Sequence, residues 1–275
     1  VTSIATGTDA AAYGLDVDDD LTKTGAILNS GTITALADAT DDSTASAYGI
    51  YVDDETAGLI VNSGTIDVKA VSTDDTAHAW GILADSELTE SGRILNSGTI
   101  KVQAITTAQG TATAYGIQVD GELNGVVKNT GTIDVLATAQ GPDYAYAYGI
   151  QSDDDMSGSI VNSGTITVEA NANDSRASAY GIYVDGDLLD GGSITNSGTI
   201  TANAKVTTDD YVFAGGFWIK GDVAGMLLNS GTITVNGLST GDCCIAEAIG
   251  FYLDADVSGS VVNSGTMTLT AQADA

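Results

Sequence analysis

The chain of 275 residues carries 37 acidic and 8 basic side chains, so its formal net charge is 8 − 37 = −29. Binding to nucleic acid or anionic lipid depends on Lys and Arg that neutralise phosphates, so this charge excludes both as ordinary partners and favours cations or cationic surfaces. Hydrophobic residues make up 43% of the chain, which is enough for a core and argues against a disordered acidic tail. A single histidine excludes mechanisms that need two.

Two local features limit the class of protein further. Cys243 and Cys244 are adjacent, a spacing that strains a disulfide between them, so we interpret them as packed thiols. The longest uncharged stretches, such as Val102 to Val119, are too rich in Thr, Gln, Ala and Gly for a membrane span. We therefore expect no membrane-spanning segment.

The whole chain is built from one repeat. The motif Asn-Ser-Gly-Thr-Ile returns every 33 or 34 residues with two substitutions, Thr130 for Ser and Met267 for Ile, and a second motif, Ala-x-Ala-Tyr-Gly-Ile, keeps step with it. Such constant spacing is the signature of a stacked repeat architecture. The first motif begins at Asn29, Asn62, Asn96, Asn129, Asn162, Asn196, Asn229 and Asn263.

Within one repeat, the hydrophobic pattern has a period of two. In chain order, it predicts strands over residues 45–52, 60–62 and 66–70, with turns rich in Asp, Gly, Thr and Ser between them. The inward position of the last strand holds only small residues. That column reads Ala37, Ala70, Ala104, Ala137, Ala170, Ala204, Gly237 and Ala271.

These strands predict an all-β fold: a parallel β-helix, or β-solenoid, of about eight coils with three short strands each. Neighbouring coils would stack at roughly 4.8 Å. Gly-Ile-x-Val and Gly-Thr-Ile-x-Val look alike, so an alternative count of two coils of about 17 residues per repeat remains open. We interpret residues 1–275 as one solenoid domain of eight repeats, either a slice of a longer array or a filament unit that stacks end to end.

The repeated asparagines suit a structural ladder. A buried turn Asn can donate its side-chain amide to the Asn of the next coil, which satisfies polar groups that would otherwise cost free energy. The alternative is a turn Asn chosen only because it tolerates a left-handed backbone.

The repeat also resembles a known family. Segments such as Gly58-Leu-Ile-Val-Asn-Ser-Gly-Thr-Ile66 and Gly158-Ser-Ile-Val-Asn-Ser-Gly-Thr-Ile166 are similar to the passenger regions of bacterial autotransporter-type and related large surface proteins. The resemblance spans nearly all of the chain. It implies a right-handed β-helix, secretion from a Gram-negative cell, and a stalk, adhesin or matrix role at the cell surface.

Paired acids in the turn after residues 45–52 and its counterparts are the strongest functional signal. Stacked like charges would repel, and a divalent cation such as Ca²⁺ could offset that repulsion by binding carboxylate oxygens from several coils. Solvated acidic turns are the alternative. The candidate cation ligands are Asp18, Asp20, Asp53, Glu55, Asp85, Glu87, Asp120, Glu122, Asp153, Asp155, Asp185, Asp187, Asp254 and Asp256.

An aromatic column has an uncertain direction. Turned outward, its rings could bind sugar or a neighbouring fibre, whereas turned inward, the interpretation we favour, they fill a corner of the core. A bulge at the glycine that follows would decide the parity. The column reads Tyr13, Tyr48, Trp80, Tyr115, Tyr148 and Tyr180, then Gly215 and Ile249.

The middle residue of the strand over residues 60–62 and its counterparts form a second column, which should face solvent. Six of its members are apolar, and Lys128 and Thr195 interrupt it. Six apolar side chains in one column are more than scattered hydrophobic residues on a protein surface would explain. We expect it to pack laterally against another chain or another part of the array. Its apolar members are Leu28, Val61, Leu95, Val161, Leu228 and Val262.

Together these features predict a non-enzymatic extracellular structural or adhesive solenoid that self-associates end to end or laterally. Alternatives are a carbohydrate- or ice-binding solenoid and a polysaccharide-degrading β-helix enzyme. Charges at Asp67, Lys101 and Asp134 interrupt the Thr array that ice binding needs, and turns of nearly equal length wall off no catalytic cleft. We expect His78 to be exposed.

The last two repeats depart from the consensus and suggest a junction or contact surface. The departing residues are Gly215, Phe217, Trp218, Lys220, Cys243, Cys244, Ile249 and Phe251.

Overall fold

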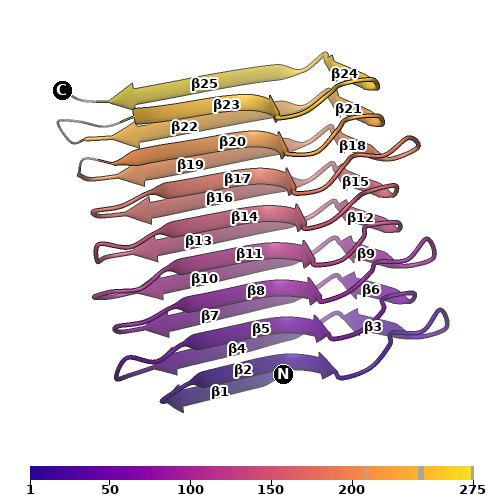
Figure 1. Ribbon diagram of the computed structural model, residues 1–275. Coiled ribbons are helices and arrows are strands. Elements are labelled where there is room, and N and C mark those ends of the chain that lie inside the picture. Colours follow the sequence, from indigo (N-terminus) through magenta and orange to yellow (C-terminus); the bar gives the residue numbers. More distant parts are fainter. Residues whose placement is uncertain (209, 241–244, 274–275) are drawn as a thin grey trace.

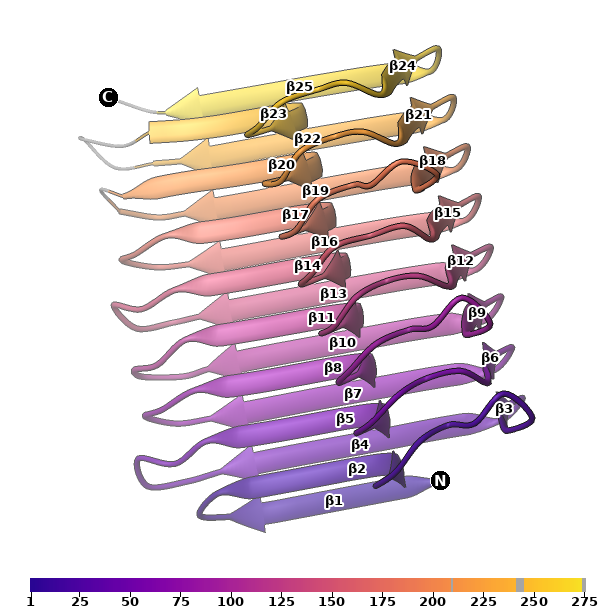
Figure 2. The same ribbon diagram turned by 45° about the vertical axis from the view of Figure 1, so that its right-hand side comes forward.

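The computed structural model describes residues 1–208, 210–240 and 245–273, whose strands wind into a parallel β-solenoid (Figure 1). Each coil passes through three sheets in turn, and the coils stack from the N-terminal to the C-terminal end (Figure 2). The described residues form strands and turns without a helix, so none of them provides a helix that could span a membrane. The predicted all-β parallel solenoid is confirmed.

The three sheets differ in strand length. The first sheet consists of β1 (Thr2–Gly7), β4 (Thr32–Ala39), β7 (Thr65–Ser72), β10 (Thr99–Thr106), β13 (Thr132–Ala139), β16 (Thr165–Ala172), β19 (Thr199–Val206), β22 (Thr232–Ser239) and β25 (Thr266–Ala273). The second consists of β2 (Ala10–Val17), β5 (Ala45–Val52), β8 (Ala77–Ala84), β11 (Ala112–Val119), β14 (Ala145–Ser152), β17 (Ala177–Val184), β20 (Tyr211–Ile219) and β23 (Ile245–Leu253). The third consists of the short strands β3 (Ala26–Asn29), β6 (Leu59–Asn62), β9 (Arg93–Asn96), β12 (Val126–Asn129), β15 (Ser159–Asn162), β18 (Ser193–Asn196), β21 (Met226–Asn229) and β24 (Ser260–Asn263).

The register shows how long one coil is. Thr65 of β7 pairs with Thr32 of β4 on one side and with Thr99 of β10 on the other. One repeat is therefore one coil, and the alternative of two 17-residue coils per repeat is wrong.

The core follows the period of two. In β7, Ile66, Val68 and Ala70 are fully buried, whereas Asp67 and Lys69 face outward and are partly exposed. The small-residue column of the first sheet is buried from Ala37 to Gly237, as predicted, and only its last member, in β25, is exposed. Small side chains there let the two long sheets approach each other closely.

The second sheet changes parity at the motif glycine. In β5, Ala45 and Ala47 are buried before Gly49, and Ile50 and Val52 are buried after it. At Gly49, a Cβ atom would lie 2.4 Å from the carbonyl oxygen of Gly81 in the next coil. Glycine is required because the neighbouring backbone leaves no space for a side chain.

The asparagines of the third sheet form a continuous hydrogen-bonded column. Asn62 Nδ2 donates to Asn96 Oδ1 at 2.8 Å, and the same bond links each neighbouring pair from Asn29 to Asn263. Asn129 is fully buried and also donates to the Thr165 backbone carbonyl at 3.2 Å. From Asn29 to Asn229, a buried polar side chain is thus satisfied in each coil, and only the last member, Asn263, is exposed.

Candidate interaction surfaces

The outer face of the third sheet is mostly apolar and free of acids. Each of its eight strands turns two side chains outward, and in the chain of net charge −29 none of these side chains is acidic. The column expected from sequence faces outward here, and Leu28 is 69% exposed. The second outward column adds Ala26, Leu59, Arg93, Val126, Ser159, Ser193, Met226 and Ser260.

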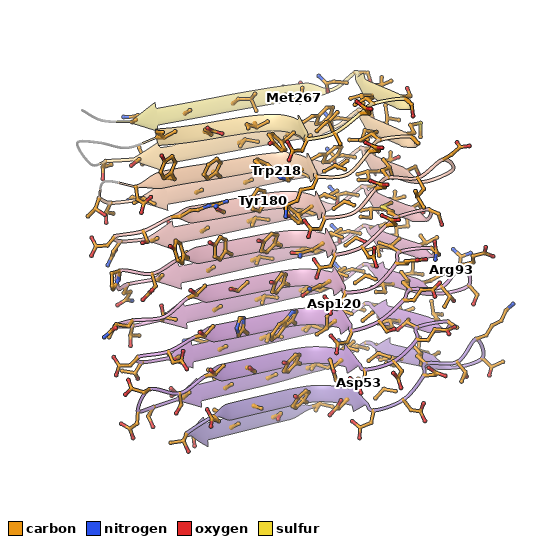
Figure 3. All side chains as sticks on the ribbon, in the orientation of Figure 1. Asp53, Arg93, Asp120, Tyr180, Trp218 and Met267 are labelled. Atoms are coloured by element: carbon orange, nitrogen blue, oxygen red, sulfur yellow. The ribbon has the colours of Figure 1, made fainter. Side chains whose placement is uncertain are left out.

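Two shallow hollows mark this face. One, of about 230 Å³, is lined by Val61, Leu95 and Lys128 among others. Another, of about 460 Å³, lies where glycine-rich turns meet Met226, and among the described residues that line it only Asp190 has a titratable side chain. Arg93 and Lys128 supply the charge on the sheet, and Figure 3 shows Arg93 projecting away from the stack.

The aromatic column lies outside the core, on the outer face of the second sheet. Tyr48 is partly exposed between buried Ala47 and Gly49, and its ring lies between those of Tyr13 and Trp80 with centroids 4.5 Å away on both sides. The favoured interpretation, packing inside a corner, is therefore wrong. The parity change at the glycine turns these rings outward.

Stacking leaves the ring faces covered. Trp80, Tyr115 and Tyr148 continue the column with interplanar angles below 10°. A sugar ring stacks on an aromatic face, but in this column each inner face already contacts the next ring. The column therefore stiffens the sheet and presents ring edges to solvent.

The irregular seventh coil preserves this packing. Gly215 leaves a gap in the aromatic column, and Trp218 reaches across it to contact Tyr180 with centroids 5.0 Å apart (Figure 3). Phe217 is fully buried and stacks on Phe251 at 4.9 Å. Trp218 thus fills the gap that Gly215 leaves, and Phe217 and Phe251 pack against each other. Cys243 and Cys244 lie outside the described residues.

The paired acids separate into two structural roles. When the second acid of a pair is Asp, its carboxylate accepts a backbone N–H from the next coil. Asp187 Oδ1 accepts the Asp222 backbone N–H at 2.7 Å, and Asp155 Oδ1 accepts the Asp187 backbone N–H at 2.8 Å. Asp20 does the same for Glu55 at 3.1 Å. In contrast, Glu87 and Glu122 accept the side-chain amide of Asn124.

In five coils, the first acid of the pair accepts a hydrogen bond from the Tyr or Gln side chain two residues before it. Tyr51 Oη donates to Asp53 and, at 2.8 Å, to Asp85 of the next coil. Tyr183 donates to Asp185, which also pairs with Lys220. Asp53 and Asp120 mark this edge in Figure 3.

Glutamines replace tyrosine in the middle coils, and there the carboxyl groups meet each other. Gln118 Nε2 donates to Asp120 Oδ1 at 3.3 Å and to Asp153 Oδ2, so one amide bridges two coils. The hydrogen-bond contact with Asp153, followed by partial burial, raises the pKa of Asp120 to about 6. Burial and the neighbouring charge of Asp120 raise the pKa of Asp85, although its hydrogen bond from Tyr51 opposes them.

A different group of acids gathers in the first turns. Within the described residues, one oxygen each from Asp19, Asp20 and Asp54 lies within 4.8 Å of the others, and all three residues are exposed. Asp19 accepts the Asp20 backbone N–H at 2.9 Å. Only Asp20 of this group belongs to the candidate ligands, so the sequence pattern missed the middle residues of the turn.

His78 is largely covered, so the expectation that it is exposed is wrong. It lies in the outward column next to the rings, 5.4 Å from the Trp80 centroid, and its Nδ1 is buried without a hydrogen-bond partner among the described residues. Burial lowers the pKa of His78, and the charge of Asp75 partly opposes this.

The partners of the acids were not identified from sequence, although a signal exists. Tyr51, Gln118, Gln151 and Tyr183 each stand two residues before an Asp of the acidic edge. Side chains at i and i+2 of an extended segment share one face. The pattern Tyr/Gln-x-Asp therefore predicts this contact once the parity of the strand is known.

The interrupted Thr array lies on the outer face of the first sheet. Thr34 of β4 aligns with Asp67, which aligns with Lys101 and then Asp134. Charged side chains thus break the flat threonine surface at three consecutive coils.

The chain matches a known protein family along most of its length. The family model of the BigA third pectate lyase-like domain matches residues 45–185 and 175–275. The chain belongs to this family. The match agrees with the resemblance seen in the repeat motif, and together the two matches span all coils from β5 onward. No curated protein and no solved structure matches the chain.

Proposed function

We propose that this BigA-type domain is a non-enzymatic structural or adhesive β-helix at the cell surface, in which copies associate laterally through the outer face of the third sheet. The observation that carries the proposal is the acid-free apolar face in a chain of net charge −29. Like-charged copies repel wherever acidic surfaces meet. This face lets two copies approach without placing carboxylates of the two sheets against each other.

The size of the face indicates a weak contact per domain. Four residues at about 3.3 Å and eight coils at about 4.8 Å give roughly 13 Å by 38 Å, or about 500 Å² per copy. A pair would bury about 1,000 Å², near the lower limit for a specific interface. Such contacts gain strength when several act together, as on a surface that displays many copies.

Several features support a role without catalysis at an extracellular location. Few lysines and abundant Thr, Ser, Asn, Gly and Asp suit a secreted protein. The turns between the described strands are of nearly equal length in every coil, so none of them walls off a cleft around a pair of carboxyl groups of the kind that glycosidases use. The family match and the resemblance to surface-protein passengers both agree with display on a bacterial cell.

Sedimentation equilibrium tests the proposal. For the native sequence, the weight-average mass should rise above the 27.7 kDa of one chain as concentration increases. Val161→Lys should abolish this rise because it places a third positive charge on the face and would require that charge to be desolvated. Leu136→Lys makes a comparable change at a partly exposed site on the first sheet and should leave association intact.

The outcomes separate lateral pairing from other arrangements. Association that survives Val161→Lys unchanged would mean that copies meet elsewhere, for instance end to end. A native chain that remains monomeric at every accessible concentration would also overturn the proposal. Circular dichroism of both variants establishes that each is folded.

A further inference from the structure

Each strand of the second sheet, from β2 to β23, contributes one ring to a continuous stack of tyrosines and tryptophans. The centroids of neighbouring rings lie 3.8 to 5.6 Å apart. Rings at this separation are in direct contact, so an electron can pass from one ring to the next. We call this set the aromatic stack, and its members are Tyr13, Tyr48, Trp80, Tyr115, Tyr148, Tyr180, Trp218 and Tyr252.

Trp80 is where an oxidant in solution can enter the stack. Its side chain is partly exposed, and an indole loses one electron readily. The Trp80 indole N–H donates to Gln118 Oε1 at 2.6 Å. An amide oxygen accepts this hydrogen bond but is too weak a base to take the proton. Oxidised Trp80 therefore keeps its positive charge and draws an electron from a neighbouring ring.

Tyr51 has the proton acceptor that Trp80 lacks. Its ring lies 5.3 Å from that of Tyr48, which stacks on Trp80 at 4.5 Å. The Tyr51 hydroxyl donates to Asp53 and, at 2.8 Å, to Asp85. A phenol that loses an electron becomes a strong acid, and a carboxylate at hydrogen-bond distance can take its proton. Burial raises the pKa of Asp85, which strengthens it as a base.

Tyr48 is suited to passing the electron rather than to holding the radical. Its hydroxyl meets the hydroxyls of Ser46 and Tyr13, which are weak bases. These hydroxyls take up a proton far less readily than the carboxylates that meet Tyr51. The radical is therefore more stable on Tyr51 than on Tyr48.

The second tryptophan of the chain has a similar arrangement. Trp218, labelled in Figure 3, stacks on Tyr252 with centroids 3.8 Å apart, and the Tyr252 hydroxyl donates to Asp254 Oδ1 at 2.9 Å. Both tryptophans of the sequence thus lead, through ring contacts, to a tyrosine whose hydroxyl meets a carboxylate.

We propose that the aromatic stack is a radical relay, which carries oxidising equivalents from Trp80 to Tyr51. A one-electron oxidant from solution, such as an inorganic radical, takes an electron from the Trp80 indole and is itself reduced to an anion. Tyr48 passes one electron to Trp80 and takes one from Tyr51. The phenolic proton of Tyr51 moves to Asp85 in the same step. The products are a neutral tyrosyl radical, a protonated carboxyl group and an intact Trp80.

The relay protects the indole, because the oxidising equivalent leaves Trp80 before the ring reacts irreversibly. Such protection suits the cell-surface role proposed above and adds a chemical function to it. The inference is independent of lateral association, because the aromatic stack lies on the second sheet and the apolar face lies on the third.

Pulse radiolysis with the azide radical tests the relay on the full chain. This oxidant attacks tryptophan in preference to tyrosine, and tryptophanyl and tyrosyl radicals absorb at different wavelengths. Trp218→Phe leaves Trp80 as the single tryptophan, so it provides the background for all measurements. In this background, we expect the tryptophanyl signal to convert into a tyrosyl signal at a rate that does not change with protein concentration.

Substitutions at the end point separate the relay from a general effect on the fold. Tyr51→Phe keeps the ring but removes the hydroxyl, so the fast conversion should be lost. The double change Asp53→Asn and Asp85→Asn keeps Tyr51 but removes its proton acceptors, and it should also abolish the fast conversion. Without these changes, conversion should be slower in heavy water because a proton moves with the electron.

Tyr144→Phe is the matched control. Tyr144 is 43% exposed and lies outside the aromatic stack, so removal of its hydroxyl should leave the rate unchanged. Circular dichroism establishes that each variant is folded.

Other results would overturn the proposal. A tryptophanyl signal that decays without a matching tyrosyl signal would show that Trp80 passes its oxidising equivalent to no tyrosine. A rate proportional to protein concentration would assign the transfer to collisions between chains. Conversion that is as fast in Tyr51→Phe as in the background would exclude Tyr51 as the end point. The same result for the double Asn variant would exclude the two carboxylates as proton acceptors.

Discussion

At the scale of single residues, one buried hydroxyl is out of place. Thr56 lies in a column of bridge residues otherwise filled by apolar side chains such as Leu21, Leu88 and Met156. It is fully buried, and its Oγ1 has no hydrogen-bond partner among the described residues. Burying an unsatisfied hydroxyl costs free energy that an apolar group of the same shape avoids.

Thr56→Val should therefore stabilise the fold. We expect the free energy of unfolding to rise by about 1 kcal/mol, measured by denaturant titration. Thr34→Val, on the partly exposed outer face of the first sheet, is the matched control and should change stability by less than about 0.5 kcal/mol. A destabilised Thr56→Val variant would mean that the hydroxyl has a partner, such as an ordered water.

The single histidine should make folding sensitive to pH. Burial lowers the pKa of His78 in the folded chain below its ordinary value of about 6.5. The unfolded chain then binds the proton more tightly, so this contribution to stability is present above about pH 6.5 and is lost as the pH falls.

Comparison with His78→Gln isolates this effect. Between about pH 7.5 and about pH 5, the native chain should lose stability relative to the variant, as measured by the difference in melting temperature. Parallel pH profiles for the two chains would contradict the assignment of a buried neutral imidazole.

At the scale of strands and turns, the repeat spacing predicted most of the architecture. The glycines, the threonines that begin the first-sheet strands, and the small inward residues recur at fixed intervals, so strand order and register follow from stacking like on like. The direction of Tyr48 did not follow. The inward-facing positions of β5 are odd-numbered before Gly49 and even-numbered after it. An alternating sequence pattern alone does not show whether Tyr48 follows the residues before the glycine or those after it.

The same limitation hid part of the acidic edge. Its carboxylates are visible in the sequence, but their contacts depend on which face Tyr51 and Gln118 occupy. The face that these two side chains occupy can be predicted only when the change of parity at the motif glycine is known. Contacts between coils, such as that of Gln118 with Asp153, involve residues 35 positions apart and need the register as well.

Turn glycines should be sensitive according to their place in the stack. At Gly131, a Cβ atom would lie 2.1 Å from the Gly98 carbonyl oxygen, whereas at Gly31, the same motif position in the first coil, nothing lies within 4 Å. We expect Gly131→Ala to destabilise the fold by about 1–3 kcal/mol. Gly31→Ala should change stability by less than about 0.5 kcal/mol in thermal unfolding. Equal losses in both variants would show that backbone conformation, rather than coil contact, requires the glycine.

At the scale of the whole molecule, the distribution of charge matters more than its sum. The acids concentrate in turns and on the outer faces of the two long sheets, while the third sheet has none facing outward. The net charge of −29 opposes association at long range, and the apolar face favours it at contact.

Lateral association should therefore strengthen when salt is added. Raising the ionic strength from about 0.05 M to about 0.5 M shortens the Debye length several-fold and screens repulsion between copies. We expect the weight-average mass at a fixed concentration to increase, as followed by light scattering. Dissociation by salt would indicate instead that ion pairs hold the copies together.

Cysteine cross-linking tests lateral pairing most directly. With Cys243→Ser and Cys244→Ser in both proteins, Val161→Cys on the third sheet and Leu136→Cys on the first sheet can be compared under mild oxidation. The account predicts a disulfide-linked dimer from Val161→Cys at low protein concentration and little from Leu136→Cys. Equal cross-linking at both positions, or a dimer only from Leu136→Cys, would contradict association through the third sheet.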